Sequence, residues 1–67
     1  MEAEIGNAAG MIWGYLDQHG ATSLNKLKRG TKLTDQLVFM GLGWLAREGK
    51  LTFARDKRSL QVSLAEQ

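Results

Sequence analysis

Apolar residues repeat at helical spacing in the first part of the chain, over the range Ile5–His19. They fall on one side of a 3.6-residue period, which predicts an amphipathic helix. Gly20 supplies the stop for this helix, and Ala21 and Thr22 are expected to form a short extended link. The predicted buried side consists of Ile5, Ala8, Ala9, Ile12, Trp13 and Leu16.

Two further helices are predicted between the link and residue 48. The first is short and covers Leu24 to about Arg29, with Ser23 as the N-cap that accepts from free backbone amides. Turn residues follow at positions 30–33, and Thr34 then caps a helix that runs to Glu48. On a 100° wheel, the inward face of this last helix is formed by Val38, Gly41, Leu42 and Leu45, flanked by Leu37 and Trp44.

The hydrophobic period changes from 3.6 to 2 after Gly49, which is the expected stop of the third helix. Apolar and polar residues alternate over 51–54 and again over 60–64, so each segment is predicted to be a strand with one buried face. The polar residues 56–59 form the turn between them. Three helices followed by a two-stranded antiparallel β-hairpin indicate an α+β winged helix, a helix-turn-helix core with a wing, as one domain over residues 1–67.

The chain also resembles a group of small bacterial winged helix-turn-helix proteins of unknown function. The resemblance covers nearly the whole chain and is carried by Gly41–Leu51, Ile5-Gly6, Ala9-Gly10, Ile12-Trp13 and Leu16. It implies the fold and a tendency to form homodimers. It implies no catalytic or ligand-binding residue.

The outward face of the third helix decides between partners, because this helix enters the major groove in DNA-binding winged helices. Base edges are read mainly by Arg, Lys, Asn and Gln, and only Gln36 and Arg47 qualify here. Asp35 at the start of the helix would repel a phosphate. Apolar side chains fit a protein contact better, unless the helix is rotated and Phe39 belongs to the core. The candidate protein interface is Gln36, Phe39, Met40, Gly43 and Arg47.

Three glycines recur every four residues along one strip of the first helix, at Gly6, Gly10 and Gly14. Glycine inside a helix costs about 0.5–1 kcal/mol relative to alanine, so a strip of three indicates a neighbour that needs the space. The wing or third helix of the same chain is the expected neighbour, and a partner subunit is the alternative.

Charge is distributed unevenly, although the net charge is only +2. Residues 1–25 carry three acidic and no basic side chains, whereas residues 26–58 carry all nine basic side chains and three acidic ones. A solvated basic face is the ordinary explanation, and phosphate contact is the alternative. Candidate nucleic-acid contacts are Lys26, Lys28, Arg29, Lys32, Arg55, Lys57 and Arg58.

Composition points away from catalysis and from cofactors. The chain has no cysteine and one histidine, His19, so we expect neither a zinc site nor a nucleophile–histidine pair. No metal, cofactor, small-molecule substrate or membrane span is expected, and the cytoplasm is the expected location. Two hypotheses remain: a non-enzymatic module that homodimerises or docks to protein through the third helix, and a DNA-binding domain that uses backbone contacts.

Overall fold

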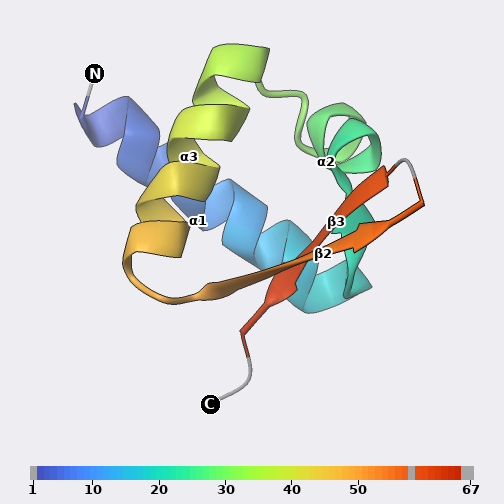
Figure 1. Cartoon of the computed structure of the whole chain (residues 1–67). Coiled ribbons are helices and arrows are strands. Elements are labelled where there is room, and N and C mark those ends of the chain that lie inside the picture. The colour runs from blue at the N-terminus through green and yellow to red at the C-terminus, as the bar shows by residue number, and fades with distance from the viewer. Residues whose placement is uncertain (1, 58, 66–67) are drawn as a thin grey trace.

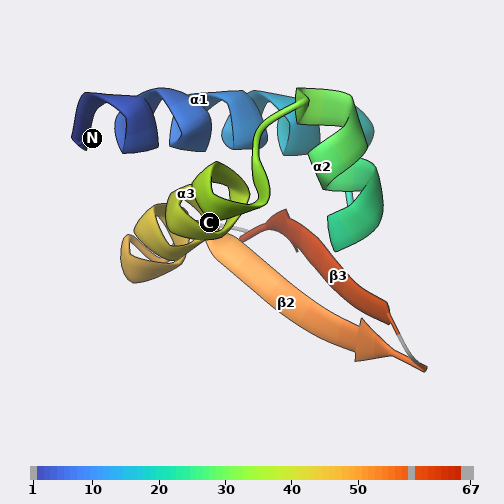
Figure 2. The same ribbon diagram turned by 90° about the horizontal axis from the view of Figure 1, so that it is seen from above.

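The computed structural model describes residues 2–57 and 59–65 and contains three helices and one small sheet (Figure 1). The order along the chain is α1 (Glu2–His19), β1 (Thr22–Ser23), α2 (Leu24–Thr31), α3 (Asp35–Arg47), β2 (Leu51–Asp56) and β3 (Ser59–Leu64). α3 crosses α1, α2 closes one end of this pair, and the hairpin of β2 and β3 projects past α3 (Figure 2).

The predicted caps and stops are confirmed. The backbone N–H of Lys26 donates to Ser23 Oγ at 3.3 Å, and that of Leu37 donates to Thr34 Oγ1 at 3.2 Å. Gly20 and Gly49 take φ values of 76° and 72°, the left-handed conformation that ends α1 and α3 with little strain for glycine. The three predicted helices therefore form in the predicted order.

α2 is longer than its sequence pattern indicates, because Gly30 and Thr31 belong to the helix and not to the following turn. The buried Thr31 hydroxyl donates to the carbonyl of Leu27 at 2.8 Å and so avoids an unpaired polar group. Gly30 lies under the ring of Tyr15, where a Cβ would overlap the aromatic carbons. The helical conformation of both residues therefore depends on tertiary packing, which the local sequence pattern of a turn does not report.

The wing prediction is wrong in strand number, because the sheet has three antiparallel strands in the order β1-β3-β2. The expected extended link at Thr22 pairs with Val62, whose other neighbour is Phe53. Pairing gives β1 partners for backbone groups that would otherwise be left near the core without them. Val62 is fully buried as a result, since strands flank it on both sides and the helices cover its face.

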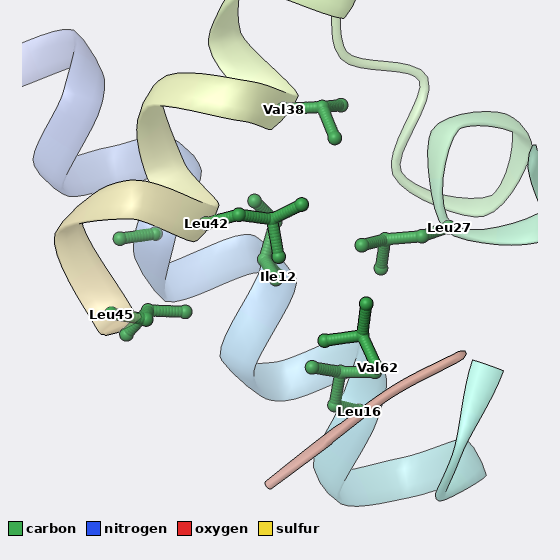
Figure 3. Close-up of a cluster of buried hydrophobic side chains, with 8 residues drawn as sticks. Ile12, Leu16, Leu27, Val38, Leu42, Leu45 and Val62 are labelled. Atoms are coloured by element: carbon green, nitrogen blue, oxygen red, sulfur yellow. The ribbon is translucent and has the colours of Figure 1, made fainter. Parts of the chain in front are cut away.

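The core lies where α1, α2, α3 and β3 meet (Figure 3). All four residues predicted at the centre of the inward face of α3 are buried, which confirms the rotation of this helix. α3 approaches α1 closely at Gly41, where an added Cβ would lie 2.8 Å from Ile12 Cδ1 and 3.2 Å from Ala9 N. The buried apolar cluster is Ala9, Ile12, Leu16, Leu27, Val38, Leu42, Leu45 and Val62.

Two core predictions are wrong, because both tryptophans are exposed: Trp44, expected on the flank of the inward face of α3, is 44% exposed. Trp13 is 43% exposed, although the helical period of α1 places it beside the buried residues. It stands at the edge of the apolar arc, where no described element covers it fully. The consequence is a large aromatic side chain left on the surface between α1 and α3.

Candidate functional site

The outward face of α3, defined as Gln36, Phe39, Met40, Gly43 and Arg47, is on the surface as expected. Phe39 is 54% exposed, so it does not belong to the core. Met40 is half-buried, and a Cβ added at Gly43 would meet nothing within 4 Å. We call this surface the α3 face. Its exposure is established, whereas its use as an interface stays a prediction.

Three contacts fix the position of α3. Thr34 caps its first turn, and Gly41 allows it to pack closely on α1. Asp35 forms an ion pair with Lys28 of α2, with Nζ and Oδ1 3.0 Å apart. Because Asp35 and Lys28 neutralise each other locally, the start of α3 carries less negative charge than its sequence indicates. The same pair removes Lys28 from the freely available cations.

A groove of about 280 Å³ lies along the contact between α1 and the second half of α3. Trp13 and Trp44 contribute the aromatic walls and are 43% and 44% exposed, and Lys50 forms an ion pair with Glu48 at 3.6 Å. Trp13 and Lys50 also border an adjoining hollow that reaches Leu64 and Ala65. The residues that line this tryptophan groove are Gly6, Ala9, Gly10, Trp13, Trp44, Leu45, Glu48 and Lys50.

The glycine strip of α1 faces open space. A Cβ added at Gly6, Gly10 or Gly14 would meet nothing within 4 Å, so the expectation that the wing or α3 needs this space is wrong. Gly6 and Gly10 border the tryptophan groove, and Gly14 lies one turn further along the helix. The spacing of the three glycines could be read from the sequence, but the sequence did not show that this side of α1 faces open space.

Gly10→Ala is expected to raise the free energy of unfolding by about 0.5–1 kcal/mol, because alanine loses less backbone entropy in a helix and meets no neighbour here. Urea denaturation followed by circular dichroism at low protein concentration measures this change. A decrease in stability would contradict the open position of the strip.

The basic residues are divided between α2 and the hairpin. Lys26, Arg29 and Lys32 are exposed on or directly after α2, and Arg55 and Lys57 are exposed at the far end of the hairpin. Arg58, the remaining predicted nucleic-acid contact, lies outside the described residues. The structure thus brings five of the seven candidates to the surface without a described ion pair.

The described residues contain no group of three or more His, Cys, Asp or Glu side chains that could hold a metal ion. His19 is exposed at the end of α1, with its ring centroid 4.2 Å from that of Tyr15. Nor does any described helix combine the length and apolarity needed to cross a bilayer.

Comparison with known proteins agrees with the architecture. The model of a family described as "Winged helix-turn-helix domain (DUF2582)" matches residues 1–64. The curated "Uncharacterized protein MJ1608" from Methanocaldococcus jannaschii is 30% identical over 66 residues, which cover 96% of this chain and 94% of that protein. The solution NMR structure of protein BT2368 from Bacteroides thetaiotaomicron superimposes with a TM-score of 0.85 at 28% identity, over 96% of this chain and 79% of that chain. The first of these relatives is archaeal, so the similarity extends beyond bacteria.

Proposed function

The chain belongs to the DUF2582 family of winged helix-turn-helix domains, and from this premise we propose that it is a non-enzymatic interaction module that homodimerises or docks to another protein through its α3 face. The observation that carries the proposal is the 54% exposure of Phe39 on the helix that winged-helix proteins use for recognition. The family description indicates no catalytic activity.

The composition of the α3 face supports protein over DNA as its partner. Phe39 and Met40 offer apolar contact, and the open space above Gly43 allows another backbone to approach closely. Only Gln36 and Arg47 carry groups that read base edges. Trp44 continues the apolar surface toward the tryptophan groove, and exposed tryptophan is typical of the energetically dominant part of protein interfaces.

The open glycine strip of α1 supports a neighbour on this side of the molecule. Three glycines lower the stability of the helix, and no contact among the described residues needs the space that they leave.

Light scattering over a concentration series tests the proposal. The wild-type chain is expected to show twice the monomer mass at high micromolar concentration. Phe39→Asp is expected to weaken the dimer at least about tenfold, because it places a charge in a desolvated apolar contact. Circular dichroism should show that the variant keeps its fold, since Phe39 lies outside the core. Met40→Glu, at the neighbouring half-buried position, should act in the same direction.

The matched control is Met11→Asp. Met11 is 48% exposed on a helix but belongs neither to the α3 face nor to the tryptophan groove, so its substitution should leave the dimer intact. A wild-type chain that stays monomeric at high micromolar concentration would rule out self-association through the α3 face. If Met11→Asp weakened the dimer as much as Phe39→Asp does, the α3 face would not be the contact.

A further inference from the structure

Strand β2 forms one edge of the three-stranded sheet, because β3 lies in the centre and β1 on the other side. Its register with β3 runs without a bulge from Leu51↔Leu64 to Asp56↔Ser59. The residues at positions 52–55 are exposed. Figure 2 shows β2 on the side of the hairpin away from α2, and no labelled element lies along its outer edge. β2 therefore presents an unpaired strand edge to solvent.

The pairing with β3 determines which backbone groups of β2 point outward. Lys50 continues the register, since the N–H of Ala65 donates to its carbonyl at 2.8 Å. Hydrogen-bonded and non-hydrogen-bonded pairs alternate along an antiparallel ladder, so the even-numbered residues of β2 bond to β3. The odd-numbered residues turn their N–H and C=O groups away from β3, and they are Leu51, Phe53 and Arg55. Among the described residues, none of the three makes a backbone hydrogen bond outside the sheet.

β2 has few of the features that commonly keep a strand edge from pairing. Such edges are blocked by proline, by a bulge, by lysine or by a covering helix or loop. The chain contains no proline, and no lysine lies between positions 51 and 56. Arg55 is the only basic residue of β2. The edge is therefore able to accept a further strand.

We infer that β2 pairs with β2 of a second copy of this chain, in antiparallel orientation about a two-fold axis at Phe53. This register places Phe53 opposite Phe53 of the second copy, and Leu51 opposite Arg55 in both directions. Each bonded pair exchanges two hydrogen bonds, so the three pairs form six and use every outward N–H and C=O group of β2 between positions 51 and 55. A shift of the register by two residues would leave one outward residue of each copy unpaired. The edge is thus complementary to itself.

The side chains agree with this register. Phe53 lies opposite Val62 in the sheet, so its ring is on the face that carries the helices. It is nevertheless 44% exposed, because the hairpin projects past α3. The two-fold axis sets two such rings side by side, and aromatic pairs stabilise adjacent strands. Leu51 meets the aliphatic stem of Arg55, and these pairs place no like charges directly opposite each other. The second copy therefore covers a ring that this chain leaves exposed.

This contact does not include the α3 face, so it goes beyond the proposed function and does not depend on it. A pair of chains joined at β2 keeps both α3 faces accessible. One short strand contributes much less than the ~800 Å² that each partner brings to a stable interface, so we expect a dissociation constant on the order of 1 mM. Self-association through β2 should therefore follow that through the α3 face as concentration rises.

Amide exchange with water, measured by NMR on the Phe39→Asp variant, tests the pairing without the α3 contact. At about 1 mM half of the chains should be paired, so exchange at Leu51, Phe53 and Arg55 should slow about twofold relative to a dilute sample. The amides of Thr52 and Ala54 should hardly change, because they are already bonded to β3. This alternation is specific to strand pairing.

Arg55→Pro removes one outward N–H and should abolish the concentration dependence at Leu51 and Phe53. Proline is tolerated on an edge strand where the N–H faces away from the ladder, and circular dichroism checks the fold. Arg55→Ala is the matched control, since it removes the same charge, keeps the amide and should pair like Phe39→Asp alone. Both changes are made in the Phe39→Asp background. If the proline variant does not fold, Phe53→Lys replaces it, because it sets two like charges opposite each other.

The inference is overturned if exchange at the three odd-numbered positions does not depend on concentration, or if the even-numbered positions slow equally. It is also overturned if Arg55→Pro pairs as well as Arg55→Ala. Slowing by an added blocked peptide of alternating valine and threonine, without any effect of concentration, would overturn the second copy in favour of a strand from another protein. Failure of the α3 contact is seen separately, as a wild-type chain that is monomeric at high micromolar concentration.

Discussion

Ile12→Ala is expected to lower the free energy of unfolding by about 2–5 kcal/mol, which is the cost of a cavity in a packed core. Ile12 is fully buried and lies at the centre of the cluster where α1 meets α3 (Figure 3). A core of this size supplies only about 3–5 kcal/mol in total, so the variant should be largely unfolded at 25 °C. Urea denaturation followed by far-ultraviolet circular dichroism measures the loss.

Met11→Ala is the control for this prediction, because Met11 is the preceding residue on the same helix and is 48% exposed. Its substitution should change stability by no more than about 0.5 kcal/mol, as is usual for a surface position. Comparable losses in the two variants would mean that the rotation of α1 differs from the one described.

Gly41→Ala is expected to destabilise the fold by about 1–3 kcal/mol through overpacking. The new Cβ would lie 2.8 Å from Ile12 Cδ1, 3.2 Å from Ala9 N and 3.4 Å from Ala8 C. The last two atoms are backbone, so relief requires α1 and α3 to move apart and to loosen the contacts around them. Thermal and urea unfolding both report this change.

Gly43→Ala tests the same substitution two residues further along α3, where nothing lies within 4 Å. It should stabilise the helix by about 0.5–1 kcal/mol, opposite in sign to Gly41→Ala. Adding Ile12→Val to Gly41→Ala removes the Cδ1 atom of the closest contact, so the double variant should lose less stability than the two single losses predict. Strict additivity would show that this contact is not the source of the destabilisation.

Two glycines that weaken α1, Gly6 and Gly10, border the tryptophan groove. In so small a domain, local choices that oppose stability are expected mainly where a partner needs them. The stability of alanine variants at these two positions, read together with light scattering, therefore separates structural from functional constraint.

Much of the fold was determined by the sequence alone. The helical period, the caps at Ser23 and Thr34, and the glycine stops defined three helices, because these signals are set by neighbours within a few residues. The change to period 2 after Gly49 located the hairpin. The apolar residues of α3 cover a wide arc of the helical wheel. Its buried residues and the outward direction of Phe39 could therefore be predicted from the helical period.

Only the tertiary structure showed which segments cover the edges of each helix's apolar face. A two-residue strand is too short to show a period, so only the position of β3 revealed that Thr22 belongs to the sheet. Trp13 at the edge of its arc, the open strip around Gly10 and the close approach at Gly41 depend on where the next helix crosses. Periodicity records which side of a helix is apolar. It carries no information on how much of that side a distant segment covers, and this coverage determines which surfaces remain for a partner.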